Sequence, residues 1–415
     1  MKVLEKFQSL SKNFNSCLRS NVPDKLVYVI LVPTLRCNLS CTYCQVSRAN
    51  ENAQGYDWDK NTLDATISYI CSNGSDDLKI EFQGGEPSLR IDLVKEVIEQ
   101  TSSRLLNPSF VICSNLQKLS PEFLELLKRP DVHLSCSLDG PQLLHQKNRT
   151  KDQLITDEFF SNLERVIQKF GHDKVSLLTT ISDFSKINEI INFYYDLEIP
   201  EIFLRPVNFQ GFARKNFQGE AKDLEKWHQA YKRGIEHIFQ RNEAGRHKLT
   251  ETTFTIHLSK FFNPGQNGYV DLRNPNPLGQ DYIVVDYDGV LYPTDEARMI
   301  SRIGLIDLSV GEVGVGLDQE KLEVLNRHSS NKDNVDCMSC RHQSYCGVDN
   351  IDDISRYGTI DIPKGNTYFC KNHMFMFDFV REKTNSTEPR DIKNLALHLT
   401  GFYKTTTLFR DWHDD

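Results

Sequence analysis

The chain has 415 residues, of which 39% are hydrophobic and 26% are charged. This composition excludes a disordered or low-complexity protein, and the length predicts two or three domains that need no disulfide bonds for stability. The 57 acidic and 49 basic residues leave a net charge of −8, which argues against nucleic acid as the main partner. Because we find no long apolar run and no secretory signal, we expect a cytoplasmic protein with no membrane partner.

Residues 26–205 alternate between strand-like and helix-like patterns. The expected strands are 26–32, 78–82, 110–113, 133–138, 175–181 and 201–204, and the expected helices are 59–70, 93–105, 121–127, 157–170 and 186–197. Such alternation predicts an α/β fold with a parallel sheet and helices outside it. Six strand–helix units are too few for a closed barrel of eight, so we predict a partial (βα)6 barrel. Its active residues should lie at the C-terminal ends of the strands.

The pattern changes after about residue 211. We expect a long helix over 223–242, a loop-rich stretch over 263–280, a hairpin over 282–292 that turns at Asp288-Gly289, and a helix near 374–381. The resulting division is an N-terminal helical segment (1–25), the partial barrel (26–215), a helical and loop linker region (216–280), a second small module (281–385) and a C-terminal tail (386–415).

Eleven cysteines carry the strongest functional signal. In a reducing compartment, clustered cysteines are more often metal ligands or reactive thiols than disulfides. Seven of them form two sets, one of Cys37, Cys41 and Cys44 and another of Cys337, Cys340, Cys346 and Cys370. The remaining four, Cys17, Cys71, Cys113 and Cys136, stand alone, and we expect them to be packing residues.

The first cysteine set follows the first expected strand directly, so it should lie on a loop at the C-terminal edge of the sheet. Structural zinc sites and iron–sulfur cubes each usually take four protein ligands. Three cysteines with no nearby fourth would leave one iron of a cube open for another ligand.

The segment Cys-Asn-Leu-Ser-Cys-Thr-Tyr-Cys, which ends at Cys44, resembles the CxxxCxxC signature of the radical S-adenosylmethionine (SAM) superfamily, with Tyr43 as the aromatic residue before the last cysteine. In that superfamily the open iron binds the amino and carboxylate groups of SAM, and reductive cleavage of SAM yields a 5′-deoxyadenosyl radical. The resemblance covers roughly residues 26–210. It implies a radical SAM fold, bound SAM and a [4Fe–4S] cluster at these three cysteines.

A glycine-rich motif after the second strand supports this resemblance. It consists of Gln83, Gly84, Gly85, Glu86 and Pro87, and it matches the GGEP motif of the superfamily. The glycines are expected to let the backbone approach the methionine end of SAM, and Glu86 is expected to pair with its ammonium group.

Polar residues also end the third and fourth strands. Asn115 follows the third strand, and Ser137 and Asp139 follow the fourth, with His145 and Arg149 further on. The fourth-strand run resembles the SxDGP…H…R run of peptide-modifying radical SAM enzymes. This resemblance implies that Ser137 and Asp139 bond to ribose or to the cluster surroundings, and that Arg149 pairs with the SAM carboxylate. The alternative for Arg149 is an ordinary surface salt bridge.

In the second cysteine set, Cys337-x2-Cys340-x5-Cys346 is followed at a distance by Cys370. Four thiolates can hold zinc or an iron–sulfur cube, and the spacing alone does not separate the two. The pattern resembles the SPASM domain of radical SAM enzymes, in which such cysteines bind the outer auxiliary [4Fe–4S] cluster. The implied cofactors are therefore two [4Fe–4S] clusters, one of them auxiliary, and SAM.

A full SPASM domain holds a second, inner auxiliary cluster, and this sequence lacks its cysteines. Thr294 stands where the family often has cysteine, and Asn350 stands at a further ligand position. We therefore expect no inner cluster. The space near the substrate is expected to be lined instead by Asp295, Glu296 and Arg298. We predict that Asp295 is catalytic, as a proton acceptor or as the partner of a cationic substrate group. The alternative is that these residues are ordinary solvated charges on a turn.

Taken whole, the motifs look like those of His-Xaa-Ser system radical SAM maturases that carry a SPASM domain. This implies an enzyme that abstracts hydrogen from a ribosomally made precursor peptide with His-Xaa-Ser repeats. The implied partners are that peptide, a second radical SAM protein or a leader-binding protein, and a reductant such as flavodoxin or ferredoxin.

Two alternatives remain open. One is an anaerobic sulfatase maturase that forms formylglycine, against which the missing inner cluster counts. The other is a non-catalytic iron–sulfur partner of another radical SAM enzyme. That reading predicts a damaged SAM pocket, whereas the three cysteines and the GGEP motif are intact.

Overall fold

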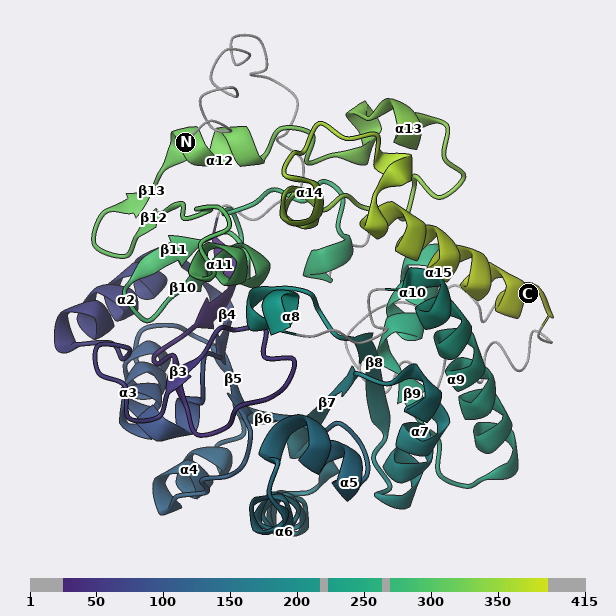
Figure 1. Cartoon of the computed structure of the whole chain (residues 1–415). Coiled ribbons are helices and arrows are strands. Elements are labelled where there is room, and N and C mark those ends of the chain that lie inside the picture. Colours follow the sequence, from purple (N-terminus) through teal and green to yellow (C-terminus); the bar gives the residue numbers. More distant parts are fainter. Residues whose placement is uncertain (1–24, 217–222, 263–268, 387–415) are drawn as a thin grey trace.

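The computed structural model describes residues 25–216, 223–262 and 269–386 (Figure 1). The helix expected over 1–25 and the tail over 386–415 fall almost entirely outside these ranges. Within them, no helix combines the length and the apolar character that a bilayer crossing needs.

Six parallel strands form the centre of the sheet and confirm the predicted α/β fold. They are β1 (Leu26–Leu31), β4 (Gly74–Phe82), β5 (Ser109–Ser114), β6 (Val132–Ser137), β7 (Val175–Ile181) and β8 (Glu201–Pro206). Their order in the sheet follows their order in the chain. The strands form an arc rather than a closed ring (Figure 1), as a barrel with too few strands requires.

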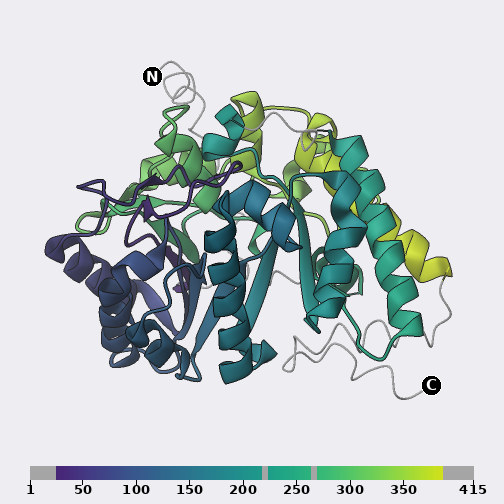
Figure 2. The same ribbon diagram turned by 60° about the horizontal axis from the view of Figure 1, so that its bottom comes forward.

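Helices cover the outer side of the arc (Figures 1 and 2). They are α2 (Lys60–Asn73), α3 (Ile91–Ser102), α4 (Pro121–Leu127), α6 (Gln153–Phe170) and α7 (Ile187–Asp196). The expected cap of α4 is confirmed, since the Ser120 side chain accepts a hydrogen bond from the Phe123 amide and Pro121 occupies the first turn. Asp59 and Asp152 cap α2 and α6 in the same way.

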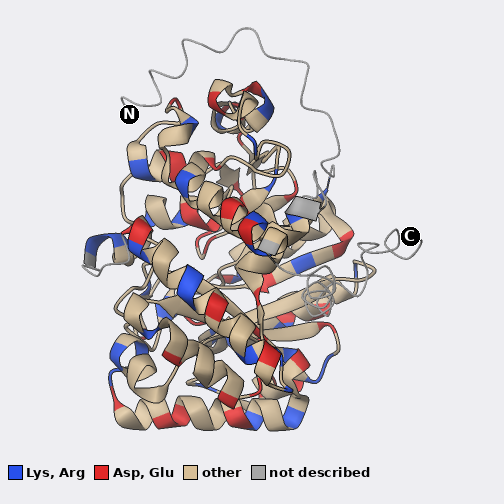
Figure 3. Cartoon of the chain, turned by 90° about the vertical axis from the view of Figure 1, so that its right-hand side faces the viewer, with Lys and Arg blue, Asp and Glu red and all other residues tan. Residues whose placement is uncertain are grey.

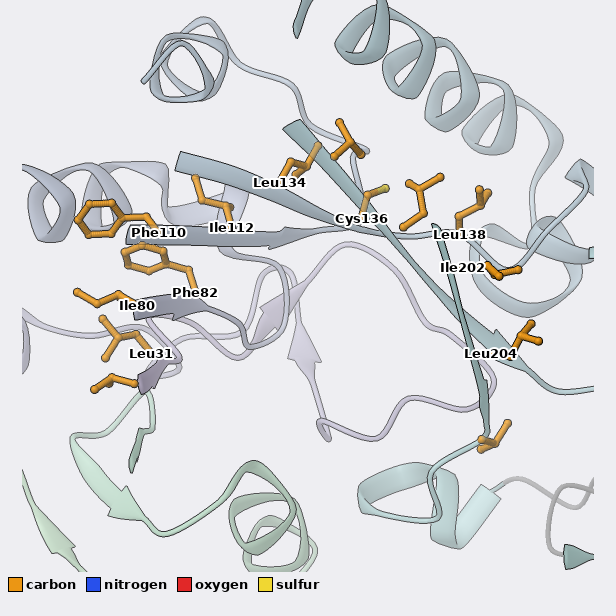
Figure 4. Close-up of a cluster of buried hydrophobic side chains, with 14 of the residues drawn as sticks. Leu31, Ile80, Phe82, Phe110, Ile112, Leu134, Cys136, Leu138, Ile202 and Leu204 are labelled. Carbon is orange, nitrogen blue, oxygen red and sulfur yellow. The ribbon is translucent and has the colours of Figure 1, made fainter. Parts of the chain in front are cut away.

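The main core lies between the sheet and these helices. Side chains alternate along each strand, so that Ile80, Phe82 and Ile112 point into the core (Figure 4), whereas Glu81 and Cys113 fall on the other face. The strands therefore present a polar concave face toward the inside of the arc, on the side where the C-terminal elements gather.

The expected hairpin over 282–292 extends this same sheet. Strand β10 (Tyr282–Val285) pairs in parallel with β1, and β11 (Val290–Tyr292) returns antiparallel to it. The chain turns at Asp288-Gly289 as predicted, and Gly289 has a φ of +83°. The short strands β12 (Gly311–Glu312) and β13 (Gly316–Leu317) continue the sheet to its edge.

The region between barrel and hairpin is mostly helical. Helix α9 (Leu224–Ala244) matches the predicted long helix, and β9 (Thr250–Glu251) adds to β8. Helix α10 (Thr252–Phe262) was not expected from the sequence. It lies against α15 (Tyr368–Ser386), which extends the helix expected near 374–381 in both directions (Figure 1).

Shorter helices complete the side of the arc opposite α4 and α6. They are α8 (Gly211–Asn216), α11 (Asp295–Arg302), α12 (Gln319–Leu325), α13 (Val335–Met338) and α14 (Asn350–Tyr357). A further short helix, α5 (Gln142–His145), follows β6 and contacts α6. Basic and acidic residues are interspersed on the face that carries α9 and α15 (Figure 3). This face offers no broad basic surface for nucleic acid.

Candidate active site

The first cysteine set lies on the loop that follows β1. Cys37 belongs to the two-residue strand β2 (Arg36–Cys37), which pairs with β3 (Ala49–Asn50). The Thr42 amide donates to the Asn148 carbonyl at 2.8 Å, and the Ala213 amide donates to the Cys44 carbonyl at 2.9 Å. Hydrogen bonds with Asn148 and Ala213, which come later in the chain, therefore hold the cysteine loop at the C-terminal edge of the sheet, where the sequence predicted it.

The three thiols of this set are close enough to affect one another electrostatically. Burial is the main reason that the pKa of Cys37 rises to about 12, with Glu86 and the other two thiols adding to the shift. Burial likewise raises the pKa of Cys41, and the Arg149 guanidinium acts in the opposite direction. Because metal ligands must be deprotonated, a metal centre at these thiols would have to displace their protons.

The GGEP loop packs directly against the start of the cysteine loop. The Gly85 amide donates to the Thr34 carbonyl at 3.0 Å, and the Glu86 amide donates to the Arg36 carbonyl at 2.8 Å. A Cβ atom would lie 2.3 Å from the Thr34 oxygen at Gly84 and 2.1 Å from the Arg36 oxygen at Gly85. In this structure, then, the glycines permit close contact between two loops, and their expected approach to SAM stays a prediction.

Glu86 ties the GGEP loop to the end of β5. Its side chain is 1% exposed, and it accepts hydrogen bonds from the Ser88 amide, the Ser114 hydroxyl and the Asn115 amide at 3.1, 2.8 and 2.7 Å. Burial raises the pKa of Glu86 despite these donors. Asn115 in turn donates to the Asn38 side chain at 2.8 Å and reaches the Cys37 sulfur at 3.8 Å.

The remaining residues of the GGEP motif and of the run after β6 have varied surroundings. Gln83 donates to Glu81 at 2.7 Å, Pro87 is buried at the start of the short helical turn Pro87–Arg90, and Ser137 is half-buried at the end of β6. His145, by contrast, stacks on Phe159 with ring centroids 4.1 Å apart and is fully buried. It therefore belongs to the packing beneath the site.

A buried polar network joins the end of β6 to the cysteine loop. Tyr43 donates its hydroxyl to Asp139 at 2.5 Å and accepts from the Arg149 Nη1 at 3.0 Å. Asn148 donates to Asp139 at 2.9 Å, and Arg149 lies 3.9 Å from it. The Arg149 side chain is 11% exposed, so the alternative of an ordinary surface salt bridge is wrong. Sequence reasoning missed Asn148, which lies within the SxDGP…H…R run without being part of its pattern.

Asp139→Ala is expected to lower the free energy of unfolding by about 3–5 kcal/mol, because it leaves the buried Arg149 without its carboxylate. Urea-induced unfolding of the metal-loaded protein measures this loss. Asp64→Ala provides the control, because Asp64 is half-exposed in a surface pair with Lys60. Equal stability of the two variants would show that the network contributes little.

The four cysteines of the second set also come together, around α13 and the start of α15. Burial raises the pKa of Cys346 to about 12 and that of Cys337 to about 11, and the neighbouring thiols add to both shifts. Burial, followed by the charge of Cys340, also raises the pKa of Cys370. The backbone carbonyl of Cys346 accepts from Asn331 at 2.7 Å, which fixes this loop.

The arrangement of the cysteines limits the kind of metal centre that either set can hold. Within the described ranges, no three His, Cys, Asp or Glu side chains form a site for a single metal ion. An iron–sulfur cube instead takes its cysteines from around a cluster of several atoms, so mutual proximity of the thiols is the relevant feature. By this criterion the residues of both sets fit a cluster.

The expected acidic turn after the hairpin is the first turn of α11. The Thr294 side chain accepts from the Ala297 amide as the helix cap, so Asp295 and Glu296 are helical residues. Asp295 is 8% exposed and Arg298 is fully buried, and their ion pair joins Asp295 Oδ1 to Arg298 Nε and Nη2 at 2.9 Å. The interpretation of these residues as solvated charges on a turn is therefore wrong.

A small cavity of about 20 Å³ lies beside α11. Thr294, Glu296, Tyr282 and Gly279 line it, together with Asp271 and Asp349, and none of its lining residues is a cysteine. This volume holds about one water molecule. Burial, followed by the like charges of Asp271, Asp295 and Asp349, raises the pKa of Glu296 well above its usual value. Sequence reasoning singled out Glu296 but missed Asp271 and Asp349, which no motif marks.

One of the isolated cysteines differs from the packing role expected for it. Cys136 is fully buried in the main core (Figure 4), as predicted. Cys113 is half-buried on the concave face of the sheet, and its thiol donates to Glu81 at 3.3 Å.

Comparison with known proteins gives a family match over much of the barrel. Residues 31–193 match the Radical SAM superfamily. The cysteine-type anaerobic sulfatase-maturating enzyme of Clostridium perfringens is 22% identical over 368 residues, which are 83% of this chain and 93% of that enzyme. The chain spans 41% and 63% of the length of two uncharacterized relatives, from Methanocaldococcus jannaschii and Methanothermobacter thermautotrophicus.

Solved structures share the fold over nearly the whole chain. The structure of anSMEcpe with bound AdoMet has a TM-score of 0.68 at 17% identity and covers 91% of this chain and 99% of its own. Streptococcus suis SuiB bound to its precursor peptide SuiA has a TM-score of 0.54 at 16% identity, over 83% of this chain and 81% of its own. With the family match and the cysteine loop at the sheet edge, residues 31–193 are a radical SAM domain.

Proposed function

We propose that the chain is a radical SAM maturase that abstracts a hydrogen atom from a peptide substrate. The observation that carries this proposal is the convergence of Cys37, Cys41 and Cys44 on one loop, to which the GGEP loop is hydrogen-bonded. SuiB with its precursor peptide, and anSMEcpe with AdoMet and the Cp18Cys peptide, are similar structures that hold peptides. They support a peptide as the substrate class.

In this proposal Cys37, Cys41 and Cys44 would hold a [4Fe–4S] cluster, and SAM would bind beside it. When bound, this pair supplies the 5′-deoxyadenosyl radical. Arg149 would pair with the SAM carboxylate, and its Nε, which has no partner among the described residues, supports this role. Tyr43 and Asp139 hold the guanidinium in that place. Gln83, Asn115 and Ser137 complete the polar wall of the SAM site.

We further propose that Cys337, Cys340, Cys346 and Cys370 hold an auxiliary [4Fe–4S] cluster. The neighbourhood of a possible inner cluster is the acidic cavity beside α11, which offers carboxylates in place of thiolates. A substrate radical that becomes an oxidised product must lose a proton as well as an electron. We propose Asp295 and Glu296 as the carboxylates that would accept that proton or pair with a cationic substrate group.

A second candidate is formylglycine formation on a sulfatase. The alignment over 93% of the Clostridium perfringens sulfatase-maturating enzyme favours it. The replacement of the inner-cluster cysteines by Thr294 and Asn350 counts against it, because a two-electron oxidation needs a route for electrons. Asn350 is 4% exposed and donates to the Leu325 and Arg327 carbonyls at 2.9 and 2.8 Å, which is a structural role.

Reconstituted protein with SAM and dithionite separates the two candidates. We expect a peptide with His-Xaa-Ser repeats to change mass while 5′-deoxyadenosine accumulates, and a sulfatase peptide with cysteine or serine at the modified position to remain unchanged. Mass spectrometry of both peptides is the measurement. Formylglycine in the sulfatase peptide alone would establish the second candidate, and 5′-deoxyadenosine without any change in either peptide would contradict both substrate assignments.

A further inference from the structure

The short segment that leads into α2 lies beside the start of the cysteine loop and pairs with it in antiparallel fashion. The Leu35 amide donates to the Tyr56 carbonyl at 2.9 Å. The Trp58 amide donates to the Pro33 carbonyl at 3.0 Å. The Trp58 side chain is 3% exposed, and its Nε1 donates to the Asp286 carbonyl at 2.8 Å. Backbone bonds and a buried side chain therefore fix this segment, which makes it a rigid support for the residue in its middle.

That residue is Asp57, and its carboxylate contacts both the cysteine loop and the GGEP loop. Arg36, which precedes Cys37, donates to Asp57 through Nε at 2.8 Å and through Nη2 at 2.6 Å. Arg90 is the last residue of the helical turn after the GGEP motif, and its Nη1 donates to Asp57 at 3.0 Å. The Thr34 hydroxyl adds a fourth bond at 2.6 Å. One carboxylate thus joins the two loops, with three of its four bonds coming from guanidinium groups.

This arrangement restricts the loops because arginine binds a carboxylate through a planar fork. The two bonds from Arg36 run to different oxygens of Asp57, so the Arg36 side chain cannot turn away without breaking both. The side chains of Asp57, Arg36 and Arg90 are between 22% and 24% exposed, so water screens them less than it screens a surface pair. The Arg36 carbonyl also accepts from the Glu86 amide at 2.8 Å. The residue before the first cysteine is therefore tied to the GGEP loop through its main chain and, by way of Asp57, through its side chain.

We propose that Asp57 is a positioning residue for SAM cleavage, because by holding Arg36 and Arg90 it sets the separation of the cysteine loop from the GGEP loop. This inference rests on the SAM site proposed above. In that site one loop would carry the cluster ligands and the other would meet the methionine end of SAM, so the separation of the loops would fix how SAM lies. A misplacement of about 1 Å in a reacting geometry can cost roughly 10²-fold in rate. Asp57 acts through the two arginines and not on SAM itself.

The test uses the full chain with two substitutions, singly and together. Asp57→Asn keeps the shape of the side chain and removes its charge, and Arg90→Gln removes only the link to the GGEP loop. Asp92→Asn is the matched control, because Asp92 is 63% exposed and bonds the other side of Arg90 at 2.9 and 2.7 Å. The readouts are iron content, the rate of SAM cleavage at saturating SAM, and hydrogen exchange in the metal-free chain. Exchange is followed at the Gly85 and Glu86 amides, which bond to the start of the cysteine loop.

We expect both single variants to hold as much iron as the parent, to cleave SAM roughly 10²-fold more slowly and to exchange these two amides several-fold faster. The double variant should be no slower than the slower single one, because both substitutions break one link. Asp92→Asn should match the parent.

Parent-like SAM cleavage or parent-like exchange of these amides in Asp57→Asn would overturn the proposal. Exchange that rises throughout the chain, or loss of iron from this variant, would also overturn it, since Asp57 would then support the structure as a whole. If the parent binds iron and cleaves no SAM, the proposed function fails, and amide exchange alone still decides whether Asp57 joins the two loops.

Discussion

Replacing any one of Cys37, Cys41 and Cys44 with Ala is expected to abolish reductive cleavage of SAM. Each substitution would remove one of the three proposed cluster ligands, and the loop has no spare cysteine to replace it. The measurement is 5′-deoxyadenosine formed under anaerobic conditions after reduction with dithionite. Cys71→Ala is the matched control, because Cys71 is also half-buried but belongs to α2 on the outer side of the sheet.

The fold should survive these three substitutions. The cysteines are half-buried at the sheet edge, outside the main apolar core, and backbone bonds from Asn148 and Ala213 hold the loop independently of the thiols. Circular dichroism and urea unfolding close to those of the parent would confirm that loss of activity is not loss of structure. Wild-type production of 5′-deoxyadenosine by any of the three variants would refute the assignment of the cluster ligands.

Asp295→Asn is expected to retain SAM cleavage and to slow formation of the modified peptide by roughly 10²-fold or more, the usual size of a general-base contribution. In the structure both contacts from Arg298 fall on Oδ1, which leaves Oδ2 outside the ion pair. The quantity to compare is the ratio of 5′-deoxyadenosine to modified peptide in variant and parent. An unchanged ratio together with an unchanged peptide rate would remove Asp295 from the mechanism.

Glu296→Gln distinguishes the role of the Glu296 carboxylate from that of the Asp295 carboxylate. Glu296 lines the cavity beside α11, whereas Asp295 is engaged by Arg298. A loss confined to Glu296→Gln would transfer the proton-accepting role to Glu296. Asp307→Asn is the control, because its carboxylate is 67% exposed in the same part of the chain and can be removed without disturbing a buried ion pair.

The regular part of the fold could be predicted from the sequence because its signals are local. Strand β7 and helix α4 have the predicted bounds, since an apolar run and a Ser120-Pro121 start each define an element without help from distant residues. The long-range features could not be read in this way. The pairing of β10 with β1 joins segments about 250 residues apart, and no local pattern specifies the neighbour of a strand.

In the candidate site, too, local motifs could be predicted from the sequence, whereas long-range contacts could not. The cysteine loops and the GGEP motif are contiguous, so their chemistry is visible in the sequence. The Tyr-Pro-Thr-Asp run was expected to form a turn, but Thr294 caps a helix and Arg298 then lies one turn from Asp295. Glu296 gains its significance from burial beside Asp271 and Asp349, which are distant from it in the chain. The specific resemblance to His-Xaa-Ser maturases remains a prediction.

The central claim is that one chain holds two four-iron clusters, at the first and second cysteine sets, and no third cluster. Iron and acid-labile sulfide analysis after anaerobic reconstitution tests it most directly. Two cubes predict about eight irons and eight sulfides per chain, from four of each per cube. About twelve of each would place a further cluster in the chain, and about four irons with one zinc would make the second set a zinc site; either result would contradict the account.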